Sequence, residues 1–235
     1  MGERTMTSEV TALLRPGDRA PNVVLPAVNQ DGTISFEDYW SRGWLLLGLF
    51  RGVFCPFCRR QLVQLAGMLP RFSDLQVTTV VVVNSPLDRA RLYFTRRPTP
   101  LVLAADPERV SHRAFGGPLH LRTLHGLTSD EVDALLYGPE AVLVDPTGEL
   151  GRPTPFVAAR HELNRRDGYV LTADEEQVRA AGPGLQMLFL IDRGGVIRWR
   201  WIETAEQPRA FGRLFPLSGL LAEVGTTVAC ADVSR

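Results

Sequence analysis

Two cysteines separated by two residues are the part of this sequence with the clearest chemical meaning. Cys55 and Cys58 stand within residues 50–60, FRGVFCPFCRR, and the only other cysteine of the 235-residue chain is Cys230. A deprotonated thiol is both a nucleophile and a metal ligand, so such a pair serves in disulfide exchange or as half of a zinc site. Two buried structural cysteines are the third interpretation, and the neighbouring sequence has to decide among them.

The cysteine pair follows an apolar run and precedes a helical pattern. Residues 44–50, WLLLGLF, predict a buried strand. Pro56 fits the first turn of a helix, where its missing N–H costs nothing, and Cys55 would then lie at the helix N-terminus. Free backbone N–H groups and the positive end of the helix dipole lower the pKa of a thiol in that position. Further along, apolar side chains recur with the spacing of one helix face, at Leu62, Leu65, Ala66 and Leu69.

Arginines on both sides of the pair add positive charge. Arg51 precedes Cys55 and Arg59 directly follows Cys58, so we expect both arginines to help stabilise a thiolate. One helical turn separates the cysteines, which brings Cys58 within disulfide reach of Cys55. A zinc site needs four ligands, but the sequence has no second Cys-x-x-Cys and no HxxxH pair among its four histidines. The context therefore favours redox chemistry, with no metal and no bound cofactor.

Composition argues against several other classes of protein. The chain has 26 basic and 26 acidic residues, a formal net charge of zero, and no lysine that could form a Schiff base. A neutral chain without a long basic run does not indicate binding to nucleic acid or to an anionic membrane surface. No segment approaches the ~18 apolar residues of a membrane helix, and residues 1–15 lack the apolar core of a signal peptide. We expect a cytoplasmic protein.

Apolar runs that alternate with helical patterns predict an α/β fold, a mixed sheet flanked by helices. Residues 77–83, VTTVVVV, are largely β-branched and predict a central parallel strand. The remaining predicted elements are a hairpin over 23–26 and 33–36, strands at 101–103, 187–192 and 196–202, and helices over 86–96, 107–116 and 208–224, the last broken near Pro216.

The chain divides into one principal domain with an insertion. We expect residues 1–16 to form an N-terminal arm, 17–224 the domain and 225–235 a C-terminal tail. The segment 118–183 interrupts the alternation of strands and helices just before the last hairpin, and we interpret it as a long insertion. It contains two capping-box signals, which indicate folded helices, at Thr128 with Glu131 and at Thr172 with Glu175.

Several short motifs, taken in their order, resemble the peroxiredoxin-like branch of the thioredoxin fold, the alkyl hydroperoxide reductase/thiol-specific antioxidant superfamily. The segment 50–60 resembles the active-site loop of that family, and residues 189–198, FLIDRGGVIR, resemble its F-I-I-D strand and the following turn. The closer likeness is to a Cys-x-x-Cys subgroup of the prostamide/prostaglandin F synthase and selenoprotein-U type. The other matching motifs are GDRAP at 17–21, TPLVLAADP at 99–107 and AFG at 114–116.

The resemblance implies a thiol peroxidase with antioxidant activity and a thioredoxin-like fold. Cys55 would attack a peroxide as a thiolate and become a sulfenic acid, and Cys58 would resolve it to a redox-active intrahelical disulfide. A thioredoxin-like protein or a low-molecular-weight thiol would then reduce the disulfide. Pro56 fits both the proline that follows the family's peroxidatic cysteine and the proline of a CPxC motif. A homodimer is an assembly that the resemblance allows.

The sequence departs from the family's pattern at three positions. Gly48 and Gly52 stand where the pattern Pro-x-x-x-Thr/Ser-x-x-Cys has its proline and its hydroxyl residue, and Gln186 stands where an arginine usually precedes the F-I-I-D strand. The missing hydroxyl leaves open a thiol–disulfide oxidoreductase or another small-molecule redox enzyme without peroxidase activity. A non-catalytic module that binds a partner or senses redox state is the second alternative. We interpret Cys230 as an exposed tail thiol.

Overall fold

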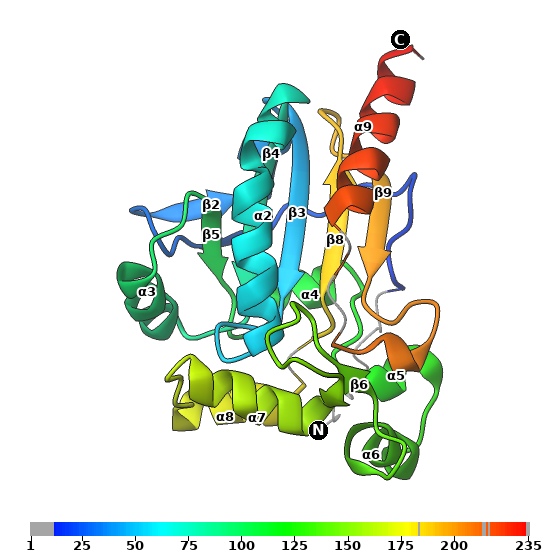
Figure 1. Ribbon diagram of the computed structural model, residues 1–235. Coiled ribbons are helices and arrows are strands. Elements are labelled where there is room, and N and C mark those ends of the chain that lie inside the picture. Colours follow the sequence, from blue (N-terminus) through cyan, green and yellow to red (C-terminus); the bar gives the residue numbers. More distant parts are fainter. Residues whose placement is uncertain (1–11, 183, 213–214, 216, 234–235) are drawn as a thin grey trace, which may run out of the picture.

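A five-stranded mixed sheet forms the centre of the protein (Figure 1). The computed structural model describes residues 12–182, 184–212, 215 and 217–233, so most of the predicted N-terminal arm lies outside the described residues. The strand order is β5-β4-β3-β8-β9, in which the first three strands run parallel and the last two are antiparallel to their neighbours. The strands are β3 (Trp44–Phe50), β4 (Val77–Val83), β5 (Val102–Ala105), β8 (Met187–Ile191) and β9 (Ile197–Ile202).

The central strand β3 is buried on both faces, because its side chains divide between two apolar layers. Leu46 and Phe50 contribute to one layer, whereas Leu45 and Leu47 contribute to the other. A continuous apolar run is typical of a strand covered on both sides. The predicted mixed sheet flanked by helices is confirmed. The first layer packs under α2 (Pro56–Asp74), α3 (Leu87–Arg96) and α9 (Leu217–Val233), and the second under α1 (Phe36–Trp40) and α4 (Val110–Ala114).

The strands lie where the apolar runs predict them, to within about two residues at either end. The predicted N-terminal hairpin is present as β1 (Val24–Pro26), which pairs antiparallel with β2 (Thr33–Ser35). The helix predicted over 107–116 is shorter, because Asp106 sets its start. The carboxylate of Asp106 accepts hydrogen bonds from the backbone N–H groups of Val110 at 2.9 Å and Ser111 at 2.8 Å.

The C-terminal region differs from the prediction. The predicted C-terminal tail, residues 225–235, is helical over its described part, because α9 continues to Val233. The apolar spacing continues with it, and Leu220, Val224 and Val228 are buried in the layer that contains α2. The prediction missed this continuation by ending the helix at Val224. Within the described residues, no helix is long and apolar enough to cross a membrane.

Residues 118–182, the described part of the segment 118–183, are folded and lie beyond the end of β3 that leads into α2 (Figure 1). Both predicted capping boxes are present, with the Thr128 hydroxyl accepting from the N–H of Glu131 and the Thr172 hydroxyl from that of Glu175. Its treatment as an insertion in the domain stays a prediction. Its elements are α5 (Leu121–His125), α6 (Ser129–Tyr137), β6 (Leu143–Val144), β7 (Thr154–Pro155), α7 (Phe156–Arg166) and α8 (Ala173–Ala180).

Candidate active site

Cys55 lies at the N-terminus of α2, at the junction between the central strand and its helix. It is the capping residue of the helix, and its Sγ accepts a hydrogen bond from the backbone N–H of Cys58 at 3.4 Å. Pro56 occupies the first helical position, where no N–H is needed. Cys55 retains 6% of its surface exposed, whereas Cys58 is fully buried one turn further on. Only the first thiol is therefore open to a ligand.

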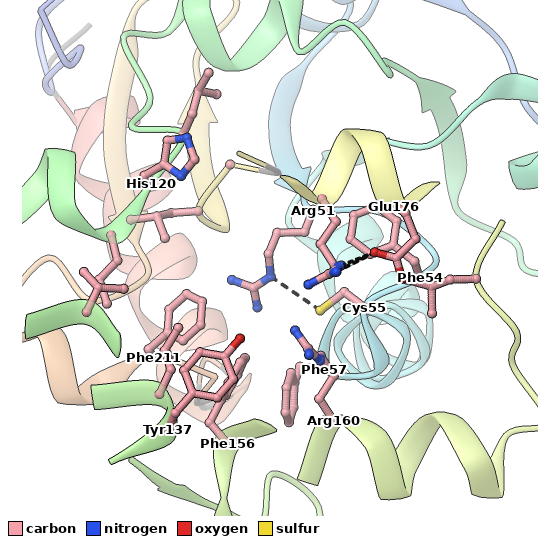
Figure 2. Close-up of a pocket in the computed structure, with 18 of the residues that line it drawn as sticks. Arg51, Phe54, Cys55, Phe57, His120, Tyr137, Phe156, Arg160, Glu176 and Phe211 are labelled. Atoms are coloured by element: carbon pink, nitrogen blue, oxygen red, sulfur yellow. Dashed lines mark hydrogen bonds and ion pairs between the residues drawn. The ribbon is translucent and has the colours of Figure 1, made fainter. Parts of the chain in front are cut away.

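Arg51 reaches the Cys55 sulfur from the end of β3. Its Nε donates to Cys55 Sγ at 3.4 Å (Figure 2), and its Nη1 forms an ion pair with the carboxylate of Glu203. The guanidinium also lies over the ring of Phe211, with 5.0 Å between its Cζ and the ring centroid. Arg51 is 4% exposed and Glu203 is fully buried, so this is an enclosed charge pair directly beside the thiol.

Glu203 belongs to this site and is absent from the residues that the sequence predicts for it. It follows β9 as an ordinary acidic residue, and nothing in the local pattern marks it. Besides Arg51, its carboxylate accepts hydrogen bonds from the backbone N–H groups of Gln186 at 3.2 Å and Gly212 at 2.9 Å. A buried carboxylate needs such donors, and here they fix the position of the group that holds Arg51.

The pKa values of the two thiols are shifted in opposite directions. Burial alone would raise the pKa of Cys55, but hydrogen bonds from Cys58 and the positive charge of Arg51 lower it to about 5. Burial raises the pKa of Cys58 well above its usual value, and the hydrogen bond and negative charge of Cys55 raise it further. At neutral pH the pair therefore holds one negative charge, on the Cys55 sulfur, which is the less buried of the two cysteines.

Gln186 contacts the second thiol rather than the first. It precedes β8, and its Nε2 donates to Cys58 Sγ at 3.1 Å. Gln186 stands at the position where the family usually has an arginine before the F-I-I-D strand. The cation beside the Cys55 sulfur is instead Arg51, which lies at the end of the neighbouring strand β3.

Arg59 does not contact the thiolate, although the sequence analysis expected it to support one. Its guanidinium donates to Asn164 Oδ1 at 2.8 Å and to the backbone oxygen of Val53 at 2.8 Å, and it pairs with the carboxylate of Asp167. Arg60 pairs with the same carboxylate at 3.0 Å. The amide of Asn164 in α7 and the carboxylate of Asp167 directly after α7 therefore bind the Arg59 guanidinium. We call the contacts of Asp167 with these two arginines the Asp167 tether.

No side chain fits at Gly52, the position where the family's pattern has a hydroxyl residue. Gly52 has a φ of 137°, a conformation that favours glycine, and a Cβ there would lie 2.5 Å from the Phe54 ring and 2.8 Å from Ser85 Oγ. The Ser85 hydroxyl, from the end of β4, accepts a hydrogen bond from the backbone N–H of Val53 at 3.0 Å. The loop before Cys55 is thus braced by a hydroxyl of another strand.

A cavity of about 290 Å³ opens above the Cys55 sulfur. Cys55 and Arg51 lie at its sheet side, together with the rings of Phe54, Phe57 and Phe211 (Figure 2). The segment 118–183 supplies most of the remaining lining, from α5, α6, α7 and α8. The segment therefore covers the Cys55 thiol and leaves a cavity between itself and the sheet.

The third cysteine does not join this site. Cys230 is exposed near the end of α9, and Figure 1 shows that end of the helix at the opposite end of the sheet from the segment 118–183. It lies on a helix rather than on the predicted tail. No group of three or more histidine, cysteine, aspartate or glutamate side chains among the described residues is placed to hold a metal ion.

Comparisons with known proteins match both the sequence and the fold. The family model described as AhpC/TSA family matches residues 16–152, more than half of the chain. No curated protein matches. Three similar solved structures are peroxidoxin BcpB from Mycobacterium tuberculosis (12% identity, covering 92% of this chain and 97% of that chain, TM-score 0.54), the mitochondrial 2-Cys peroxiredoxin from Plasmodium falciparum (10%, 94% and 98%, 0.56) and AhpC from Mycobacterium bovis (13%, 90% and 91%, 0.53). At these identities the likeness concerns the fold.

Proposed function

The chain belongs to the AhpC/TSA family, and on that premise we propose that it is a thiol-dependent peroxidase in which Cys55 reduces the substrate and Cys58 resolves the oxidised thiol. The family supports a thiol-dependent redox function in general. The observation that carries the finer proposal is the pKa of Cys55, lowered to about 5 at the floor of a cavity and beside Arg51. A thiolate at neutral pH is the form that attacks a peroxide.

The first step transfers one oxygen atom to the sulfur. The Cys55 thiolate attacks an oxygen of the hydroperoxide ROOH, the O–O bond breaks, and RO⁻ leaves and takes a proton from solvent to become the alcohol. Cys55 is then a sulfenic acid, oxidised by two electrons, and the peroxide is reduced by two. The Arg51 guanidinium, 3.4 Å from the sulfur through its Nε, can stabilise the charge that develops on the leaving oxygen.

The second step forms the disulfide. The Cys58 sulfur attacks the sulfenic sulfur of Cys55, the S–O bond breaks, and the Cys58 proton leaves with the hydroxyl as water. The negative charge of Cys55 is one of the causes that raise the pKa of Cys58, after burial. Oxidation to the neutral sulfenic acid removes that charge, so Cys58 becomes a better nucleophile only when Cys55 has reacted.

A thiol reductant completes the cycle, and we propose a thioredoxin-like protein or a low-molecular-weight thiol. It would attack Cys55, because Cys58 is fully buried and does not line the cavity. Two external thiols give up two electrons and return both cysteines to the reduced state. A cytoplasmic location and a homodimer stay predictions.

A thiol–disulfide oxidoreductase without peroxidase activity is the second candidate. The observation that favours it is Gly52, where the family's hydroxyl residue would orient a peroxide and where no side chain fits. The same cysteine pair would then exchange disulfides with another thiol compound.

Peroxide consumption in the presence of dithiothreitol separates the two candidates. We expect hydrogen peroxide or cumene hydroperoxide to be consumed by the wild type, and Cys55→Ser to reduce the rate to that of the reductant alone. When the pre-reduced protein is freed of dithiothreitol and then treated with peroxide, Cys58→Ser should accumulate a sulfenic acid that dimedone traps. Cys230→Ser is the matched control and should behave as the wild type. An absence of turnover, with the Cys55–Cys58 pair still cycling as a disulfide, would contradict the peroxidase proposal and leave the oxidoreductase.

A further inference from the structure

The cavity above Cys55 combines apolar walls with arginine side chains. The rings of Phe57 and Phe156 are stacked with centroids 4.9 Å apart, and Phe156 also contacts Phe211 at 4.7 Å. Leucines of α5 and α6 extend this apolar surface. Such walls suit the carbon skeleton of an organic molecule, whereas hydrogen peroxide has no apolar part that could pack against them.

Arg160 lines this cavity and, like Arg122, has no carboxylate partner within the described residues. It lies on α7, where the neighbouring Arg165 and Arg166 both pair with Glu162. Arg160 makes only a 3.5 Å contact with the ring nitrogen of His161. Figure 2 shows its guanidinium turned toward the interior of the cavity. It is thus a cation left available to a bound molecule.

A second donor in the same cavity also lacks a partner. The Nη2 group of Arg51 is buried and has no hydrogen-bond partner among the described residues, whereas Nε and Nη1 of the same side chain are bonded. Buried donors in proteins are normally satisfied, so an unpaired one beside a cavity indicates a missing acceptor. Arg51 lies next to the reactive sulfur, which makes a peroxide oxygen a fitting acceptor.

We propose that this cavity selects organic hydroperoxides that carry a carboxylate, an inference that rests on the peroxidase function proposed above. The peroxide group lies at Cys55 and Arg51, the carbon skeleton lies among the phenylalanine rings, and the carboxylate pairs with Arg160. Arg122, which also lines the cavity, adds to its positive potential. Arg160 is then the residue that determines substrate preference, and it belongs to the segment that covers the thiol.

An arginine suits this task because its planar guanidinium can bind a carboxylate through two charge-assisted hydrogen bonds. Arg160 is half-buried, and its partner in the complex would be partly shielded from water by the cavity walls. We expect loss of the pair to weaken recognition of the carboxylated substrate about tenfold. A substrate with the same skeleton and no carboxylate should be unaffected.

The test compares cumene hydroperoxide with its 4-carboxy derivative, since the two peroxides differ only in the carboxylate. With dithiothreitol as an uncharged reductant at neutral pH, kcat/KM of the wild type should be about tenfold higher for the carboxylated peroxide, and Arg160→Gln should bring the ratio close to one. Arg165→Gln is the matched control, because it removes an arginine of the same helix that does not line the cavity. A ratio near one in the wild type, or an equal effect of Arg165→Gln, would overturn the proposal.

A second measurement separates this inference from the peroxidase function. 4-Isopropylbenzoate has the same skeleton and carboxylate but no peroxide, and its binding to the reduced protein can be measured by calorimetry and by protection of Cys55 from iodoacetamide. We expect the wild type and Arg165→Gln to bind it, and Arg160→Gln to bind it about tenfold more weakly. Binding with this pattern but no peroxide turnover would support the carboxylate site and refute only the peroxidase. Equal binding by all three proteins, or by none, would refute the site.

Discussion

The sheet side and the covering side of the cavity hold their charges in different ways. On the sheet side, Arg51 and Glu203 are almost completely enclosed, and the carboxylate is shared with the backbone N–H groups of Gln186 and Gly212. On the covering side, Arg160 is half-buried and open to the cavity, and the segment 118–183 is joined to α2 through the half-buried Asp167 tether. The difference suggests a division of labour. We propose that the sheet side sets the reactivity of the Cys55 thiol and that the segment determines which molecules reach it.

The largest effect should come from removing the charge on the sheet side. We predict that Arg51→Met raises the pKa of Cys55, because the effect of burial is then opposed only by the hydrogen bonds from Cys58 and no longer by the charge and hydrogen bond of Arg51. In the wild type, the rate of alkylation by iodoacetamide should rise with pH through a midpoint near 5. A midpoint moved to that of an ordinary thiol, near 8.5, would reduce the thiolate fraction at pH 6.5 about 100-fold.

The control must separate reactivity from folding. Arg51→Met leaves Glu203 buried without its cation, which typically costs about 3–5 kcal/mol. The double variant Arg51→Met/Glu203→Gln removes the uncompensated charge, so we expect it to regain much of the lost stability and to keep the slow alkylation. If the double variant alkylates as fast as the wild type at pH 6.5, then Arg51 is not what lowers the pKa, and the assignment of thiol reactivity to the sheet side is wrong.

The sequence predicted the sheet side well because most of its signals are local. The apolar run of β3, Pro56 after Cys55 and the spacing of α2 all lie within about 30 residues, and each has one satisfactory structural interpretation. Arg51 was predicted for the same reason. Glu203 was missed because it is 152 residues away from Arg51, and an acidic residue after an amphipathic strand is usually a surface residue.

A smaller effect is expected from cutting the Asp167 tether. Asp167→Asn removes the charge that Arg59 and Arg60 share, and because Asp167 is only half-buried we expect a loss of about 1–2 kcal/mol in the free energy of unfolding. Urea denaturation measures this, and faster hydrogen exchange should appear in α7. The pKa of Cys55 should not change, since neither arginine contacts its sulfur. A shift in that pKa would mean that the two sides are not independent.

The tether also predicts a pH dependence. Burial would raise the pKa of Asp167, but hydrogen bonds from Arg60 and Arg59 lower it. A carboxyl group with a lowered pKa stabilises the fold fully above its unfolded pKa of about 4, and the contribution is lost as the pH falls through the lower folded value. The difference between wild type and Asp167→Asn should therefore be complete at pH 7 and shrink below pH about 4. Glu162→Gln, which breaks exposed pairs on the same helix, is the control and should change little.

The Asp167 tether shows why the position of the covering side could not be predicted from the sequence. The capping boxes at Thr128 and Thr172 were predictable because each lies within four residues. The position of the segment over Cys55 depends on contacts such as Arg59 with Asp167, which are 108 residues apart and leave no periodic signal. The same contacts explain why Arg59 binds Asp167 and not the thiolate, as its place in the sequence had suggested. An arginine next to a cysteine in sequence suggests such a role, but a carboxylate brought in by folding binds it more strongly.

The smallest effect should come from Gln186, whose side chain contacts Cys58. Gln186 Nε2 donates to Cys58 Sγ, and its Oε1 has no partner among the described residues, so Gln186→Leu removes one hydrogen bond at little cost in packing. Because Cys58 is the thiolate released when a reductant attacks Cys55 in the disulfide, we expect reduction by dithiothreitol to slow by about three- to tenfold. Stopped-flow oxidation of the reduced protein by peroxide should be unchanged, because that step occurs at Cys55 beside Arg51. Equal slowing of both steps would show that Gln186 acts on the site as a whole, and the sheet side would then not treat its two sulfurs separately.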